Sequence, residues 1–92
     1  MIERHFYIAA QINEVMAKHE GVAKAVNEAI EQFNNNEWGK VPPEDKEANR
    51  ADLRAREGRI LGRYETPQGD IYIDMTFNGE EEEAVIMFVK EY

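Results

Sequence analysis

The last third of the chain alternates hydrophobic and polar residues, and this pattern constrains the fold more than any other feature of the sequence. A period of two is typical of a strand with one buried face, so we expect a strand over residues 70–77. Its inward-facing residues are Ile71, Ile73, Met75 and Phe77. Asn78-Gly79 follows directly, and this pair predicts a tight hairpin because both residues tolerate positive φ.

Two further strands flank this one. Residues 59–65 predict the strand before it, and Thr66-Pro67-Gln68-Gly69 predicts the connecting turn. Residues 84–89 are apolar on both faces, which is typical of a central or well-covered strand. The three strands together predict an antiparallel meander.

The first third is helical after one short strand. Residues 4–9 alternate, with Phe6 and Ile8 on one side and His5 and Tyr7 on the other. Two amphipathic helices follow. Their apolar stripes are Ile12, Val15, Met16 and His19 in the first helix, and Val22, Val26, Ala29, Ile30 and Phe33 in the second. We expect Gly21 to end the first helix as a left-handed cap and the asparagines at 34–36 to end the second.

A third helix is predicted after Pro42-Pro43, because proline suits a first helical turn. Leu53 is its only large apolar residue, and its other apolar positions are Ala48, Ala51 and Ala55. With so narrow an apolar face, this helix is expected on the surface, with Gly58 closing it.

The predicted fold is therefore a single α+β domain over residues 1–92 with the order β-α-α-α-β-β-β. We expect the helices to cover one face of the three-stranded meander. Whether the first strand becomes a fourth member of the sheet, and where it joins, does not follow from the pattern.

The charge and composition exclude several classes of function. The net charge of −8 gives the whole chain no cationic footprint for nucleic acid, and it favours a basic partner instead. Without cysteine and serine, Thr66 and Thr76 are the only hydroxyl nucleophiles apart from tyrosine. The start of the sequence predicts no signal peptide, and no apolar run is long enough to span a membrane. We therefore expect a cytoplasmic protein without a cofactor.

The single tryptophan, Trp38, has two interpretations. Tryptophan dominates binding hot spots, so Trp38 beside Gly39 is a candidate contact for a partner. The alternative, which we favour, is that the indole packs over the helix junction and locks the loop, with its N–H on a loop carbonyl.

A second candidate contact for a partner is the run of four glutamates, Glu80, Glu81, Glu82 and Glu83. They could also imitate a row of phosphates or bind a cation, although the spacing of a calcium loop is missing. A solvated turn that keeps the hairpin edge from pairing with other chains is the more common role of such a run.

The two histidines and a cluster of arginines are the other polar groups that stand out in the sequence. His5 and His19 lie far apart without spaced partner ligands, so we predict no metal site. Arg50, Arg54 and Arg56 form a basic concentration, but acidic residues are interleaved with them, which is typical of a solvated mixed face.

Short motifs such as Glu37-Trp38-Gly39 and Gly58-Arg59-Ile60-Leu61 occur in a fixed order from Phe33 onward. On these motifs the sequence resembles a family of small uncharacterised proteins of plasmids, conjugative elements and phages. The resemblance covers about two-thirds of the chain. It departs from the family at Lys40-Val41 and at the turn from Asn78 to Glu83. The matching pieces are Glu37-Trp38-Gly39, Glu44-Asp45 with Asn49, Gly58-Arg59-Ile60-Leu61 with Tyr64, Gly69 before Ile71-Tyr72-Ile73, and Glu91-Tyr92. The resemblance implies a mobile genetic element as the habitat and implies no activity.

The predicted order of elements is also similar to that of the RelE/ParE toxin fold. That likeness implies an alternative function, a RelE-like ribonuclease or a degenerate relative. Arg59, Arg63 and Tyr64 would then lie near the RNA.

Our first hypothesis is a non-enzymatic accessory protein of a mobile element that acts by binding another protein. An acidic domain of this size could inhibit a host nucleic-acid-handling protein by occupying its basic groove, as anti-restriction or anti-CRISPR proteins do. A third hypothesis is a self-associating structural protein, because residues 84–89 could cover a homodimer interface.

Overall fold

Four strands form one mixed sheet in the computed structural model, which describes residues 2–92. They are β1 (Glu3–Ile8), β2 (Arg59–Tyr64), β3 (Ile71–Asn78) and β4 (Glu81–Phe88). Their order across the sheet is β1-β4-β3-β2. The antiparallel pairs β2–β3 and β3–β4 confirm the predicted meander. β1 is a fourth strand, and it lies parallel to β4 at the edge of the sheet.

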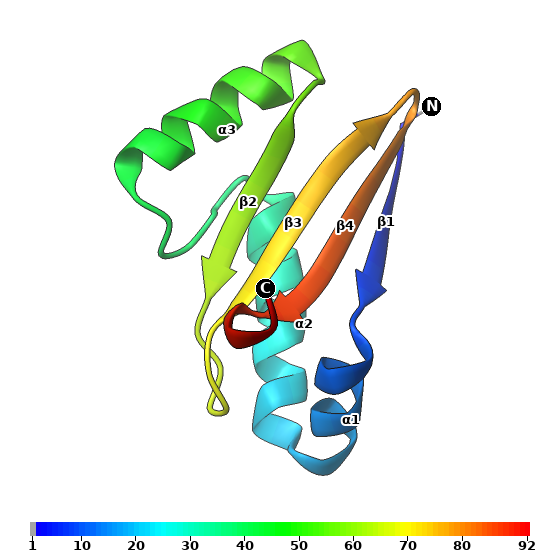
Figure 1. Cartoon of the computed structure of the whole chain (residues 1–92), viewed down its shortest axis with the longest axis vertical. Helices are drawn as coiled ribbons and strands as arrows, with labels where there is room; N and C mark the ends of the chain where they lie inside the picture. Colours follow the sequence, from blue (N-terminus) through cyan, green and yellow to red (C-terminus); the bar gives the residue numbers. More distant parts are fainter. Residues whose placement is uncertain (1) are drawn as a thin grey trace.

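Three helices connect β1 to the meander, in the predicted order. They are α1 (Ala10–Lys18), α2 (Glu20–Asn34) and α3 (Pro43–Ala55). In Figure 1, α2 lies behind the sheet, α1 lies below the end of β1 next to α2, and α3 lies beside β2. The chain ends in a 3-10 turn, Val89–Glu91, on the side facing the viewer. The face of the sheet opposite α1 and α2 is called the open face below.

The core lies between the sheet and α1 and α2. Alternate residues of β3 and β4 face these helices, and Val22 and Phe33 of α2 pack against them with less than 2 % exposure. Burying an aliphatic or aromatic side chain of this size contributes about 1.5–3 kcal/mol. The buried residues of largest volume are Phe33, Ile12, Ile60, Ile71, Ile73, Met75, Ile86, Val22 and Val26.

The predicted end of the first helix was wrong. α1 ends before His19, whose extended backbone separates it from α2, and Gly21 lies in the first turn of α2. Gly21 is used for a close approach instead: a Cβ there would lie 3.3 Å from the ring of Pro67. Glycine is therefore suited to position 21 because the helix packs closely against the β2–β3 loop there. The rule that a glycine often ends a helix takes no account of such a long-range contact.

The last hairpin is shifted by one residue from its predicted place. Asn78 pairs with Glu81 inside the ladder, so the two turn residues are Gly79 and Glu80. Gly79 has φ +64°, which suits glycine at the first position of a two-residue turn. β4 consequently begins at Glu81, so three of the four glutamates belong to a strand.

The third helix lies on the surface, as predicted, where Leu53 packs against the hydrophobic core and Asn49 makes polar contacts with β2. Ala48, Ala51 and Ala55 are exposed, and the buried residue of α3 is Asn49. Arg56, rather than Gly58, is the left-handed residue that ends the helix. Hydrophobic periodicity did not indicate the burial of Asn49, because Asn49 is polar and its side-chain amide bonds the backbone of Leu61.

Candidate protein-binding surface

Trp38 is buried, with 3 % of its surface exposed, so its ring offers no exposed anchor to a partner. The loop-locking interpretation is the one that the structure supports. Gly39 allows the loop to lie against β2, because a Cβ at this position would clash with the Arg63 carbonyl oxygen. Its φ of +70° also favours glycine. One detail differs: among the residues described, the Trp38 Nε1–H has no acceptor, so it does not bond a loop carbonyl.

Two cavities flank this loop. A cavity of about 400 Å³ lies between α2 and the end of β2, and its polar lining includes Glu28, Lys40 and Glu65. The second, of about 370 Å³, is lined by Asn36, Trp38, Arg50, Leu53 and Arg54. Neither lining contains histidine, serine or threonine, and in the first cavity Lys40 forms an ion pair with Glu65 at 3.2 Å.

The four glutamates do not form one acidic surface. Strand alternation turns Glu82 towards the helices and leaves Glu81 and Glu83 on the open face. Glu82 is 3 % exposed. The glutamate run is also far from Trp38 along the sheet, since the loop at Trp38 bonds Arg63 near one end of β2 and the glutamates lie at the other end of the ladder. The structure therefore does not bring the predicted partner-binding residues together.

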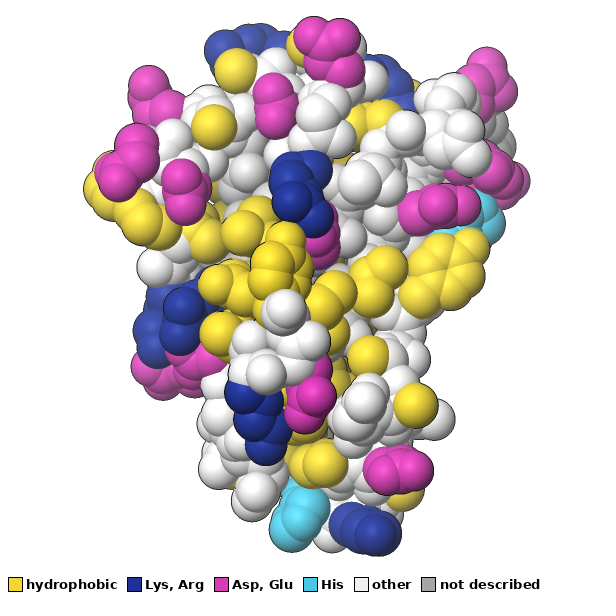
Figure 2. Space-filling view, viewed as in Figure 1, with side chains coloured by type: hydrophobic (Ala, Val, Ile, Leu, Met, Phe, Trp, Pro, Cys, Tyr) yellow, Lys and Arg dark blue, Asp and Glu magenta, His cyan; other side chains and the backbone are white. Residues whose placement is uncertain are grey.

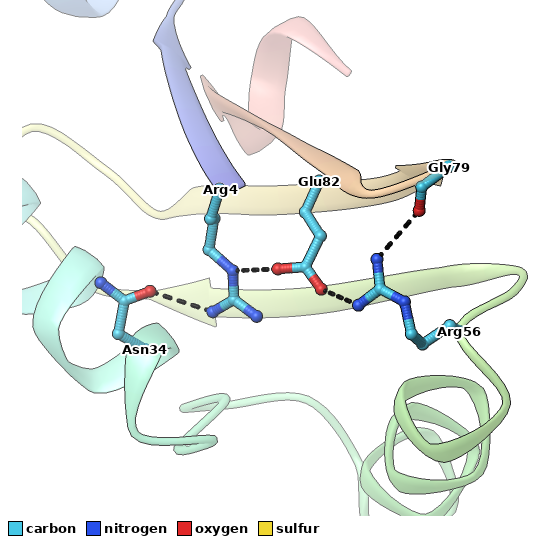
Figure 3. A network of polar contacts seen from close by, with 5 residues as sticks. All are labelled: Arg4, Asn34, Arg56, Gly79 and Glu82. Atoms are coloured by element: carbon cyan, nitrogen blue, oxygen red, sulfur yellow. Dashed lines mark hydrogen bonds and ion pairs between the residues drawn. The ribbon is translucent and has the colours of Figure 1, made fainter. Parts of the chain in front are cut away.

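Glu82 holds the centre of an ion-pair network (Figure 3). Arg4 Nε donates to one carboxylate oxygen at 2.8 Å and Arg56 Nη1 donates to the other at 2.7 Å. Arg4 also donates to Asn34, and Arg56 to the Gly79 carbonyl, so β1, α2, α3 and the hairpin meet here. Burial raises the pKa of Glu82, but the hydrogen bonds from Arg4 and Arg56 outweigh it and hold the pKa below its usual range.

The residues predicted to lie near RNA are committed to contacts inside the protein. Arg59 pairs with Asp74, and Arg63 donates to Asp70 at 2.9 Å. Tyr64 is buried, its hydroxyl donates to the Glu37 carbonyl at 2.8 Å, and burial with the Glu37 charge raises its pKa. Lys40 and Arg63 together lower the pKa of Asp70. Both arginines are thus paired with carboxylates, and their side chains stay 56 % (Arg59) and 38 % (Arg63) exposed.

The outer edge of β2 is closed by side-chain and loop contacts. The Asn49 amide donates to the Leu61 carbonyl at 2.9 Å and accepts from the Leu61 N–H at 3.1 Å, as a neighbouring strand would. Two residues further on, the Arg63 N–H donates to the Trp38 carbonyl and the Lys40 N–H to the Arg63 carbonyl. The backbone groups that face outwards from β2 are therefore satisfied at Leu61 and Arg63.

The outer edge of β1 is open. Glu3 and Ala9 donate their N–H groups to β4, so alternate residues point that way and Arg4, Phe6 and Ile8 direct their N–H and C=O groups outwards. Neither proline, lysine nor a bulge protects this strand. Within residues 2–92, one edge of the sheet is thus closed and the other presents backbone groups without a hydrogen-bond partner.

Exposed hydrophobic side chains gather at this open edge. The large hydrophobic residues with substantial exposure in residues 2–92 are Ile2, Tyr7, Ile8, Val85 and Tyr92. Tyr7 and Val85 are register partners on the open face, and Ile8 lies on the other side of β1. Figure 2 shows hydrophobic side chains forming a band across the open face, with acidic side chains above it towards the upper right. We call Tyr7, Ile8 and Val85 the β1 surface.

Acidic residues flank the β1 surface towards the hairpin. Glu3 and Glu81 are register partners on the open face, with side chains 59 % and 53 % exposed. His5 lies between them, with Nε2 3.5 Å from Glu3 and 3.7 Å from Glu81. Within the described chain, these three are the group close enough together to hold a metal ion. Exposed acidic groups are common without a metal, and we assign none.

Sequence reasoning missed the two most specific contacts. The buried role of Glu82 follows from its parity with Ala84 and Ile86, once β4 is known to begin at Glu81. Tyr7 carried a weak signal, since an aromatic residue on the polar side of residues 4–9 leaves that strand apolar on both faces. For Asn49 the hydrophobic pattern gives no signal, because its partner is the backbone of Leu61.

No protein-family model, curated protein or solved structure matches this chain. The helices found in residues 2–92 are all too short or too polar to cross a membrane.

Proposed function

We propose that this protein is a non-enzymatic accessory protein that acts by binding another protein through the β1 surface. The observation that carries the proposal is the open edge of β1, where Tyr7, Ile8 and Val85 remain exposed although the opposite edge of the sheet is closed. Exposed apolar side chains that gather in one place mark interaction sites more often than scattered ones do.

The charge distribution supports a basic partner. Glu82, Asp74 and Asp70 bind five of the eleven lysines and arginines, so the rest of the chain is more acidic than its net charge of −8 suggests. Glu3 and Glu81 place part of that charge beside the β1 surface. Together with the resemblance to proteins of mobile elements, this favours a host nucleic-acid-handling protein as the partner class.

The test is capture of a partner from a host lysate, compared between variants. Tyr7→Lys and Val85→Lys should each abolish capture, because a lysine there adds charge to the apolar contact. Ala51→Lys, an exposed substitution on α3, is the control and should capture as well as the wild type. Capture should also weaken in high salt. Loss of capture in all three variants, or in none, would contradict the proposed surface.

Self-association is a second candidate, because the same patch would fit a second copy of the chain. Light scattering over a range of protein concentrations separates the two. A monomer at all concentrations favours a different partner, and a dimer that Tyr7→Lys dissociates favours self-association.

A further inference from the structure

We propose that the partner binds by strand addition: an extended segment that alternates apolar and basic residues pairs with the open edge of β1 as a fifth strand. This inference rests on the proposed function and specifies its mode and the chemistry of the partner segment. In strand addition, backbone hydrogen bonds supply affinity and alternate side chains supply specificity.

The backbone of β1 already has the required geometry. Its bonds to β4 use alternate residues and leave the N–H and C=O groups of Arg4, Phe6 and Ile8 directed to the edge. An added strand would satisfy these three positions in turn. The closure of the β2 edge by Asn49 and the 38–40 loop leaves β1 as the edge that can accept a strand.

Exposure on both sides of β1 favours an added strand over a partner that covers only the open face. Tyr7 is 52 % exposed on the open face, and Ile8 is 37 % exposed on the side of the helices. A strand laid along the edge projects side chains to both faces, so it would contact both residues. A flat partner on the open face would leave Ile8 in water.

Charge determines the composition of the segment. The open-face side of β1 carries Glu3 and, across the ladder, Glu81. Side chains of the added strand on this face therefore gain from being lysine or arginine. On the other side, Phe6 and Ile8 offer apolar contacts beside the Arg4–Glu82 pair, which favours apolar side chains. The result is an alternation of basic and apolar residues.

The test uses two synthetic peptides, one alternating valine and lysine and the other alternating valine and glutamate, titrated into the full chain. The valine–lysine peptide should bind and the valine–glutamate peptide should not. Ile8→Pro removes one outward N–H without touching a bond to β4, so it should weaken binding about tenfold or more. Ile8→Val keeps the N–H and is the matched control, with binding close to that of the wild type.

A charge reversal keeps the test independent of whether Ile8→Pro folds. Glu3→Lys combined with Glu81→Lys changes two exposed side chains and should transfer the preference to the valine–glutamate peptide. Equal binding of the valine–lysine peptide to Ile8→Pro and Ile8→Val would overturn strand addition, as would an unchanged preference after the reversal. If Tyr7→Lys still abolished capture of the host partner, the proposed function would stand without this mode. A dimer that excludes both peptides would show that a second copy occupies the edge and would also overturn the inference.

Discussion

Glu82 has a structural role that its place in the glutamate run does not indicate. In the sequence it is one of four glutamates in a row, and in the fold it is a buried carboxylate between two guanidinium groups. Removing one member of a buried ion pair leaves the others uncompensated, which costs more than the pair contributes.

We therefore expect Glu82→Gln to lower the free energy of unfolding by an amount near the lower end of about 3–5 kcal/mol, the range typical of a broken buried pair. The lower end applies because the side chains of Arg4 and Arg56 are 22 % and 30 % exposed. Glu83→Gln, one residue away on the open face, is the matched control, with a change within about 0.5 kcal/mol. Urea unfolding measures both variants, and equal losses would contradict the buried role of Glu82.

The pH dependence of the stability difference between the wild type and Glu82→Gln tests the lowered pKa of Glu82. Because this pKa is lower in the folded state than in the unfolded state, the stabilisation is fully present above the unfolded value, about 4.3. It is lost as the pH falls through the folded value. The stability difference between wild type and Glu82→Gln should thus be constant near neutral pH and shrink below about pH 4.3. A difference that grew on acidification would have the wrong sign.

Among the strands, the two edges of the sheet differ in whether other parts of the chain cover them. β2 is closed by Asn49 and by the loop at Trp38, whereas β1 has no such cover. A surface helix with a narrow apolar face is held here by backbone-directed hydrogen bonds, and these also block the edge that it covers.

Asn49→Ala should lower the free energy of unfolding by about 1–3 kcal/mol, because it leaves the N–H and C=O of Leu61 without their partner. Asn49→Asp keeps the acceptor but loses the donor and sets a carboxylate against the Leu61 carbonyl, so at neutral pH it should be at least as destabilising. Asn27→Ala, on the exposed side of α2, is the control. Thermal unfolding of the three variants checks this, and an Asn49→Ala protein as stable as Asn27→Ala would contradict the edge role.

The elements themselves were largely predictable, and their junctions were not. Period-two alternation, with the apolar run at 84–89, predicts the four strands and apolar stripes predict α1 and α2, because burial of one face imposes that pattern locally, and Pro42-Pro43 predicts the start of α3. The end of α1, the turn at Gly79-Glu80 and the parallel position of β1 depend on contacts between residues distant in the chain. The pattern gave only a weak signal for Tyr7, because its exposure depends on β1 being an edge strand, whereas Val85 is exposed because no helix covers the open face.

In the whole molecule, the two faces and the two edges of the sheet differ in what covers them. Helices cover one face, polar contacts close one edge, and the remaining edge joins exposed hydrophobic residues to exposed glutamates. We therefore propose that the outer edge of β1 is unpaired in the free protein and becomes paired in the complex.

Amide hydrogen exchange of β1, measured residue by residue by NMR, shows whether this edge is paired. In dilute free protein the N–H groups of Phe6 and Ile8 should exchange fast, while those of His5 and Tyr7, directed to β4, exchange slowly. Addition of the valine–lysine peptide should slow Phe6 and Ile8 and leave His5 and Tyr7 unchanged. Slow exchange at Phe6 and Ile8 before any peptide is added, or fast exchange that persists at saturation, would contradict the account.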